Sequence, residues 1–289
     1  MNDGDDRQLC VLLLSCVGVG PRYLLPLSDE FHRRYKLVSY VNNYAPSIPD
    51  QMVSLEREIA GASVLIHHSP DWLPWLGDKH EEYEATLARV PSGVRKISYP
   101  LPHFHPLWPF HTDEARNKDP AREFNRHGVQ PVYHFGDSHV IGLLKQGVPQ
   151  EEIISRYLAL DVATVVDLDQ LMSSTLSMAA RCDRACDVKV ADFIATEYRS
   201  HRIFQTINHG ANRLHFYSAN EILKLLDCPP LPEIILDQTR ELIDAPMPIH
   251  PNIARHFGLA YADEATRYPF DEFRNLTFAE YIRGYVYFS

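Results

Sequence analysis

The chain has 289 residues, 45% of them hydrophobic and 23% charged, which is the composition of a globular protein with a sizeable core. Its formal net charge of −10 argues against a general nucleic-acid-binding function, because there is no basic excess to neutralise phosphates. No segment approaches the ~20 apolar residues that a membrane span requires.

Cysteine usage indicates a reducing compartment. The five cysteines, Cys10, Cys16, Cys182, Cys186 and Cys228, are odd in number, and their spacing matches neither a disulfide framework nor a zinc site. Acidic residues precede the first apolar run, whereas a secretory signal begins with basic ones. We therefore expect a cytoplasmic protein without a bound metal, and the sequence does not indicate its oligomeric state.

Four apolar segments in the first 100 residues predict strands: QLCVLLLSCV (8–17), YKLVSYVNN (35–43), ASVLIHHS (62–69) and VRKISYPL (94–101). Helical patterns at 48–61 and 80–90 separate the later segments. Alternation of this kind predicts parallel βαβ units with functional residues at the carboxyl ends of the strands. We expect a small parallel sheet of four to five strands within residues 8–100.

The rest of the chain has a different pattern. Residues 100–130 are rich in proline, histidine and aromatic residues and show no period, which predicts a long loop of the kind that is often functional. Residues 131–289 are mostly helical in pattern. Helices are expected at 148–160, 168–187, 190–204, 218–230 and 278–288. Without repeats or a Gly/Ser linker, one α/β domain over residues 1–289 is predicted.

The stretch Gly136-Asp137-Ser138-His139 follows an apolar run and precedes an amphipathic segment, as a nucleophilic serine often does. Enzymes of the SGNH hydrolase superfamily carry a Gly-Asp-Ser block and a late Asp-x-x-His block, and here Asp244 and His250 lie six residues apart. The alternative is that Asp137 and Ser138 cap the helix beginning near Val140. The cap is the favoured interpretation.

Five ordered blocks resemble the WcbI-like polysaccharide biosynthesis proteins, acetyltransferases that bind coenzyme A and act on capsular sugars. The blocks are CVLLLSCVGVGPRYLL, ASVLIHHSP, ISYPLPHFHPLWPF, FGDSHVIGLLKQGVPQEEIISRYL and VADFIATEYRSHRIFQTINHGANRLHFYSANEIL. Together they span about residues 9–226. The resemblance implies an SGNH/Rossmann-like three-layer arrangement and coenzyme A or acetyl-CoA as acyl donor. Relatives carry tyrosine in place of Ser138, so only Asp137 and His139 of this motif match the family.

Cys16 is the better candidate nucleophile. It follows the most apolar predicted strand, close to a helix N-terminus, where amides and the helix dipole favour a thiolate. Gly18 and Gly20 would let backbone amides approach a developing oxyanion. The resemblance places Ser15, Val17 and Gly18 at the cofactor, with Ser15 and Val17 replacing the family's Asn and Gln. The alternative is a buried structural cysteine.

His209, in TINHGANR, is the candidate general base, because a histidine with a pKa near neutral can take a proton from a sugar hydroxyl. Asn208 beside it could orient the ring or polarise a carbonyl. His103 and His105 are weaker candidates. The alternative for any single histidine is a structural role.

Three arginines are candidates for binding the phosphates of coenzyme A, because guanidinium groups form bidentate hydrogen bonds with phosphate. They are Arg22, Arg199 and Arg202. Arg202 matches the family's Arg-Leu-Phe position and is preferred. The alternative is that each lies on a solvated helix face.

The sequence therefore predicts an acyl-CoA-dependent O-acetyltransferase that acts on a sugar of a surface polysaccharide or its precursor. His209 would activate the acceptor, either for direct attack on the thioester or for attack on an acylated Cys16. Two alternatives stay open: a serine esterase or deacetylase using Ser138, Asp244 and His250, and a non-catalytic protein that binds coenzyme A or a sugar nucleotide.

Overall fold

The structure is a computed structural model that describes residues 6–40, 49–72, 79–118, 133–242, 246–271 and 273–288. Its central feature is a parallel sheet with the strand order β2-β1-β3-β4. The strands are β1 (Gln8–Leu13), β2 (Tyr35–Ser39), β3 (Val64–His68) and β4 (Arg95–Tyr99). All four lie within the predicted segments, so this part of the prediction is confirmed.

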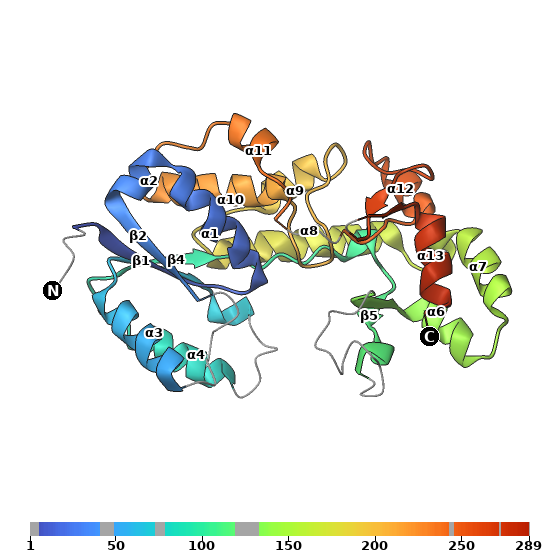
Figure 1. Ribbon diagram of the computed structural model, residues 1–289, viewed down its shortest axis with the longest axis horizontal. Helices are drawn as coiled ribbons and strands as arrows, with labels where there is room; N and C mark the ends of the chain where they lie inside the picture. The colour runs from blue at the N-terminus through green and yellow to red at the C-terminus, as the bar shows by residue number, and fades with distance from the viewer. Residues whose placement is uncertain are drawn as a thin grey trace.

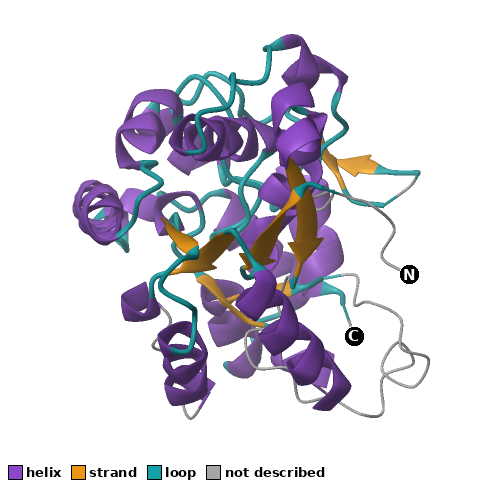
Figure 2. Cartoon of the chain, turned by 90° about the vertical axis from the view of Figure 1, so that its left-hand side faces the viewer, coloured by secondary structure: helices purple, strands orange, loops and turns teal. Residues whose placement is uncertain are grey.

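Helices cover both faces of this sheet, which confirms the three-layer arrangement (Figures 1 and 2). One layer contains α1 (Val19–Leu24), α2 (Asp29–Arg34) and α10 (Asn212–Leu225). The opposite layer contains α3 (Pro49–Gly61) and α4 (Lys79–Ala88). Strands covered on both faces are expected to be apolar at every position, and all five residues of β3 are buried.

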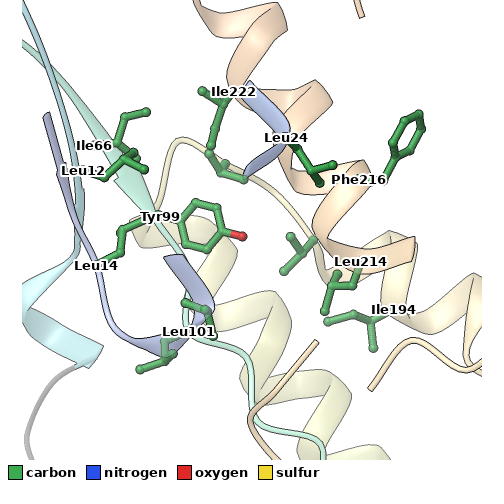
Figure 3. Packing of buried hydrophobic residues seen from close by; sticks show 14 of the residues in the cluster. Leu12, Leu14, Leu24, Ile66, Tyr99, Leu101, Ile194, Leu214, Phe216 and Ile222 are labelled. Carbon is green, nitrogen blue, oxygen red and sulfur yellow. The ribbon is translucent and has the colours of Figure 1, made fainter. Parts of the chain in front are cut away.

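The main core lies between the sheet and α10 (Figure 3). Leu12 and Ile66 from neighbouring strands and Ile222 from α10 are fully buried. Burying a side chain of this size contributes about 1.5–3 kcal/mol. The same cluster includes residues as late as Ala262, so segments from both ends of the chain share one core.

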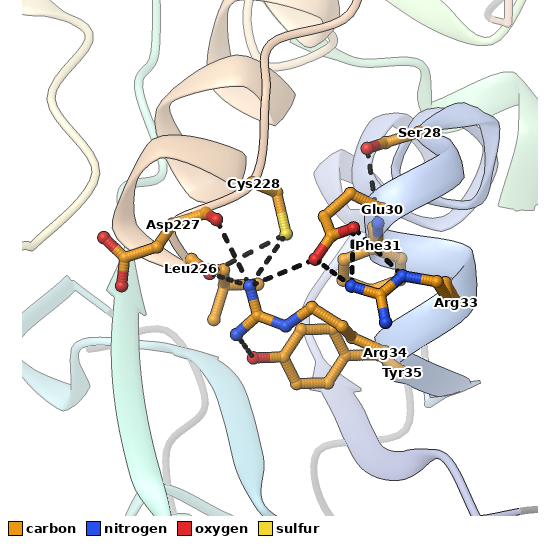
Figure 4. Close-up of polar contacts among 9 residues, drawn as sticks. All are labelled: Ser28, Glu30, Phe31, Arg33, Arg34, Tyr35, Leu226, Asp227 and Cys228. Atoms are coloured by element: carbon orange, nitrogen blue, oxygen red, sulfur yellow. Dashed lines mark hydrogen bonds and ion pairs between the residues drawn. The ribbon is translucent and has the colours of Figure 1, made fainter.

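Arg34, the last residue of α2, ties that helix to the end of α10, 192 residues away (Figure 4). Its Nη1 donates to the carbonyl of Leu226 at 2.9 Å and to that of Asp227 at 3.2 Å, while Nη2 donates to the Tyr35 hydroxyl at 3.0 Å. The last carbonyls of a helix lack partners within the helix and carry partial negative charge. The Arg34 guanidinium group supplies these carbonyls with both hydrogen-bond donors and a positive charge.

The remaining helices are α6 (Ser138–Lys145), α7 (Gln150–Leu158), α8 (Leu168–Ala185), α9 (Ala191–Glu197), α11 (Ile234–Gln238), α12 (Pro251–Phe257) and α13 (Phe278–Val286). In Figure 1, α6, α7, α12 and α13 lie at the end of the molecule away from the sheet, α9 and α11 lie near α10, and α8 runs between the two ends. A smaller core packs α6, α7 and α13 together around Tyr157 and Tyr285. Among the described residues no helix is long and apolar enough to cross a membrane.

Short elements complete the fold. Two antiparallel pairs were not predicted: β5 (His111–Asp113) with β6 (Phe135–Asp137), and β7 (Tyr268–Pro269) with β8 (Asn275–Leu276). The single-turn 3₁₀ helices are Cys16–Gly18, Leu25–Leu27, Pro70–Trp72, His105–Leu107, Ala115–Lys118 and Val162–Thr164. The predicted loop at 100–130 thus contains β5 and two helical turns, and its last part lies outside the described residues.

Two helix boundaries differ from the prediction. The helix expected at 190–204 ends at Glu197, and the helix expected at 218–230 begins at Asn212. Between these two helices the chain makes a tight loop, closed by an antiparallel bridge between Phe204 and Gly210. The apolar residues of this loop are buried by tertiary contacts. The segment therefore has the apolar composition of a buried helix although it is not helical.

Candidate active site

The turn that carries Cys16 is held at the carboxyl edge of the sheet by His68, the last residue of β3. The Nε2 atom of His68 lies 3.1 Å from the backbone nitrogen of Ser15 and 3.1 Å from its hydroxyl oxygen. The Nδ1 atom lies 3.0 Å from the carbonyl oxygen of Tyr99, at the end of β4. One side chain therefore links the ends of β1, β3 and β4.

The contacts of His68 determine its protonation. Because Nε2 accepts from the Ser15 amide, the ring proton lies on Nδ1 and is donated to Tyr99. Burial lowers the pKa of His68 to about 4, so the ring is neutral at pH 7. His68 is not among the site residues predicted from the sequence, although it is a polar residue at the end of an apolar strand.

The thiol of Cys16 is half-buried, and burial raises its pKa. Hydrogen bonds from the Ser15 side chain and from the amides of Cys16 and Val17 offset only part of this rise. This rise in pKa favours the thiol over the expected thiolate. The helices that follow have three and six residues, too few for a strong dipole.

The two glycines after Cys16 differ from their expected role. The amide of Gly18 donates to the Ser15 carbonyl at 2.8 Å, inside the turn, so it has no free hydrogen to offer an oxyanion. Gly20 allows a close helix contact, because a Cβ atom there would lie 2.4 Å from Nδ1 of His215 on α10. Its lack of a side chain serves packing.

A cavity opens at this edge of the sheet, and we refer to it as the sheet-edge cavity. It is lined by Val17, Tyr99, Pro100, Pro102, Val190, Phe204, Asn208, Gly210, Leu214, His215 and Ser218. The lining joins the Cys16 turn to the loop of His209, through Val17 on one side and Asn208 on the other. The lining is mostly apolar, which suits an acyl thioester better than a nucleotide.

His209 lies in the loop closed by Phe204 and Gly210. Its Nδ1 is 2.7 Å from Oγ1 of Thr206, which in turn is 3.2 Å from Oδ1 of Asn208. The Thr206 hydroxyl has one proton, so both contacts are satisfied when Nδ1–H donates to Thr206 and Thr206 donates to Asn208. This arrangement leaves a lone pair on Nε2, as a general base requires.

The environment of His209 keeps it neutral. Burial lowers its pKa, and the nearby ring of His134 lowers it further. The loop itself is fixed from outside, since its Ile207 carbonyl accepts from the Phe104 amide at 2.6 Å and the rings of Phe104 and Phe204 stack at 5.1 Å. The aromatic segment after β4 therefore positions the histidine loop.

Other histidines gather near His209. His103 and His105 pack edge to face with ring centroids 5.9 Å apart, and the Phe135 ring contacts the rings of His111 and His209, at 4.8 and 6.5 Å. Burial lowers the pKa of His103, His105 and His111. Within the described ranges no three His, Cys, Asp or Glu side chains are arranged to hold a metal ion.

Asp137 and His139 belong to the second core, apart from the sheet-edge cavity. Asp137 caps α6 by accepting from the Val140 amide at 2.9 Å, and its other carboxylate oxygen accepts from the Tyr157 hydroxyl. Burial raises the pKa of Asp137. The ring of His139 packs on Phe110 and Tyr157. The cap prediction is confirmed for Asp137, whereas Ser138 is exposed at the first helical position.

The serine-hydrolase alternative has no geometric support in the described residues. The Nε2 atom of His250 is 3.0 Å from the Tyr157 carbonyl, and its Nδ1 accepts from the Asn252 amide at 3.1 Å. Both ring nitrogens are therefore engaged, with none left for Ser138. Asp244 lies outside the described residues.

A second, aromatic cavity lies among the rings of the segment after β4 and the second core. It is lined by Leu107, Trp108, Pro109, Phe110, His111, Phe135, Gly136, Asp137, Tyr157, Met247, Pro248, His250, Ile253, Phe278, Tyr281, Ile282 and Tyr285. Phe135, whose ring is 6.5 Å from that of His209, forms part of its wall. His209 itself lines neither cavity; its neighbours Asn208 and Gly210 line the sheet-edge cavity, and the Phe135 ring lies between His209 and the aromatic one.

None of the three candidate arginines lines the sheet-edge cavity. The guanidinium of Arg202 packs on Tyr268 at 4.9 Å and on Tyr261 at 5.7 Å, and donates to the Met247 carbonyl. Arg22 and Arg199 are exposed and lie over the tyrosines next to them in sequence. The phosphate role remains a prediction, and the structure gives Arg202 a packing role.

Comparisons with known proteins identify the family and the fold of this chain. The family model of the polysaccharide biosynthesis enzyme WcbI matches residues 10–231. A solved structure of WcbI, described as a novel polysaccharide biosynthesis enzyme, superposes with a TM-score of 0.73 at 17% identity, over 96% of this chain and 88% of that one. That structure is described as the native protein without a disulfide bond between coenzyme A and one of its cysteines. No curated protein sequence matches significantly.

The match includes the Cys16 turn, the strands that support it and the His209 loop, so it covers both sides of the sheet-edge cavity. At 17% identity the structural likeness establishes the fold alone, which is the α/β arrangement described above. The family match covers more than half of the chain. The protein therefore belongs to the WcbI family of polysaccharide biosynthesis enzymes.

Proposed function

We propose that the protein is an acyl-CoA-dependent O-acyltransferase, in the simplest case an acetyltransferase, acting on a sugar of a capsular or other surface polysaccharide or its precursor. The observation that carries this proposal is the sheet-edge cavity, which joins the Cys16 turn to the loop of His209. The description of a WcbI structure in terms of coenzyme A and one of its cysteines supports coenzyme A as the ligand class. A cytoplasmic location would suit such a donor.

In this mechanism the sugar hydroxyl lies against Nε2 of His209 and the thioester lies in the sheet-edge cavity. As the hydroxyl oxygen attacks the thioester carbonyl carbon, its proton passes to Nε2. The carbon–sulfur bond then breaks, and the leaving thiolate of coenzyme A takes the proton back from the imidazole. His209 must begin neutral, and its lowered pKa ensures that it does.

The direct route is favoured over an acylated Cys16. Because burial raises the pKa of the Cys16 thiol, little thiolate is present at neutral pH. The Gly18 amide, bonded within its turn, offers no help to an acylation step. Cys16 then borders the acyl group without bonding to it.

The acceptor would approach from the aromatic cavity. Its wall carries Trp108, Phe110 and Phe135, whose rings are suitable for stacking against a sugar. His111 and Asp137 add polar groups to the same wall. The aromatic cavity approaches His209 through Phe135, whose ring is 6.5 Å from that of His209.

The test is release of coenzyme A from acetyl-CoA in the presence of a panel of free sugars, nucleotide sugars and oligosaccharides. The wild type should release it only with a matching acceptor. His209→Gln should lose about 10²- to 10⁴-fold in rate, the contribution of one positioned base. His201→Gln is the control, since His201 is exposed and paired with Glu197 at 2.9 Å. Equal rates for the two variants would contradict the role of His209.

A further inference from the structure

His215 is a fully buried histidine at the start of α10, with 2% of its surface exposed. One edge of its ring packs under α1, where the absent side chain of Gly20 leaves room for Nδ1. The opposite edge, with Cε1 and Nε2, faces Gly210 in the loop of His209. The ring therefore reaches from the Cys16 side of the site to the His209 side.

The Nε2 atom of His215 has no hydrogen-bond partner, although it is shielded from solvent. Nearly all buried polar groups in folded proteins are paired, and an unpaired one is costly. Because His215 also lines the sheet-edge cavity, a group bound there is the natural partner for Nε2.

The charge state of His215 limits what this partner can be. Burial, and then the neighbouring His209, lower the pKa of His215 to about 4, so the ring is neutral at pH 7. The Gly210 backbone contact acts in the opposite sense and favours a proton on the edge that faces it. A neutral N–H in an apolar cavity suits a neutral acceptor such as a carbonyl oxygen better than a phosphate.

We propose that Nε2–H of His215 donates a hydrogen bond to the carbonyl oxygen of the acyl thioester and holds it as negative charge develops during attack. This inference rests on the proposed function, and it assigns stabilisation of the developing oxyanion to a side chain. The Gly18 amide, the group expected from the sequence, is bonded within its own turn. His209 would activate the acceptor while His215 polarises the donor.

Coenzyme A and a thioester analogue separate this role from general cavity structure. The analogue is acetonyl-CoA, a ketone that keeps the carbonyl and cannot transfer an acyl group. His215→Phe retains a ring but removes the N–H, and His215→Gln can place an amide N–H near the position of Nε2. Ser218→Ala is the control, because Ser218 lines the same cavity while its hydroxyl donates to the Leu214 carbonyl at 2.8 Å.

Calorimetry on the wild type and the three variants should give the following pattern. His215→Phe should weaken acetonyl-CoA binding about five- to tenfold, the effect of one hydrogen bond, and change coenzyme A binding less than twofold. His215→Gln should recover most of the loss, and Ser218→Ala should leave the ratio of the two affinities unchanged. The acetyl-transfer rate of His215→Phe should fall about 10²- to 10³-fold, as for loss of an oxyanion donor.

If His215→Phe binds both ligands with the wild-type ratio, or weakens both equally, the proposed contact is wrong while the proposed function stands. If the wild type binds neither ligand, the proposed function fails and this inference with it. Should His215→Phe not fold, ¹⁵N NMR of the wild type decides. The Nε2 resonance of His215 should shift with acetonyl-CoA and not with coenzyme A, and an equal response to both would overturn the proposal.

Discussion

The Nε2 atom of His68 lies 3.1 Å from both the backbone nitrogen and the hydroxyl oxygen of Ser15, the residue that precedes Cys16. The two residues are 53 positions apart in sequence, and parallel pairing of β1 with β3 brings them together. This contact fixes the position of the Cys16 turn relative to the end of β3.

Replacement of His68 by alanine should therefore destabilise the fold. It removes a fully buried ring and leaves the Ser15 amide and hydroxyl without an acceptor, so a loss of about 2–4 kcal/mol in unfolding free energy is expected. Ser15→Ala removes only the hydroxyl and should cost about 1 kcal/mol. Urea unfolding measures both, and equal losses would contradict the anchoring role of His68.

Acid should destabilise the protein through its buried histidines. His68 and His215 have pKa values of about 4 in the folded state, against an ordinary value of 6.5. As the pH falls below 6.5 the unfolded chain binds protons that the folded chain does not, so stability decreases down to about pH 4. Each histidine can contribute roughly 3 kcal/mol to this loss.

The measurement is unfolding free energy in urea between pH 7 and pH 4.5, for the wild type and for His215→Gln. The variant lacks one of the titrating histidines and should show a shallower decline towards acid. A decline identical to that of the wild type would mean that the pKa of His215 is not lowered in the folded state.

The strands and layers of the sheet domain could be predicted from sequence, because strands covered on both faces are rich in apolar residues, as in QLCVLL of β1. The short pair β5–β6 could not, since three residues such as His111–Asp113 are too few to show a period. The start of α10 was also missed. Its first turn, Asn212-Arg213-Leu214-His215, is polar in composition and is helical because it packs against α1.

The candidate site was predictable in part. Cys16 and His209 could be found because each lies at the end of an element or in a polar loop between apolar segments. Their charge states could not, since the pKa of Cys16 depends on burial that only the fold shows. His68 could not be identified because its partners, Ser15 and Tyr99, are distant in sequence. His215 could not be identified because its unpaired Nε2 is visible only in the fold.

The cap of α6 gives a prediction that separates two neighbouring residues. Asp137→Ala removes the acceptor of the Val140 amide and of the Tyr157 hydroxyl, and should cost about 2 kcal/mol. Ser138→Ala should change stability by less than about 0.5 kcal/mol and leave acetyl transfer intact, because Ser138 is exposed. Labelling of Ser138 by a fluorophosphonate would reverse this interpretation.

Arg34 gives a prediction for the contact between α2 and α10. Arg34→Met keeps the apolar stem and removes the donors to Leu226 and Asp227, so a loss of about 1.5 kcal/mol is expected, the lower end for charged hydrogen bonds. Arg33→Met is the matched control, since Arg33 is exposed and pairs with Glu30 within the same helix. Thermal unfolding should show a larger loss of stability for Arg34→Met than for Arg33→Met. Equal losses of stability would contradict a stabilising contact between Arg34 and the end of α10.

The central claim is that the pantetheine end of coenzyme A lies beside Cys16, and the rate of Cys16 alkylation tests it most directly. Cys16 is half-buried while the other four cysteines are buried, so iodoacetamide should modify it first, as mass spectrometry and a Cys16→Ser control would establish. Coenzyme A at about ten times its dissociation constant should slow this reaction about tenfold. Adenosine 3′,5′-bisphosphate, which lacks the pantetheine arm, should not slow it. Alkylation of Cys16 at an unchanged rate in saturating coenzyme A would contradict the account.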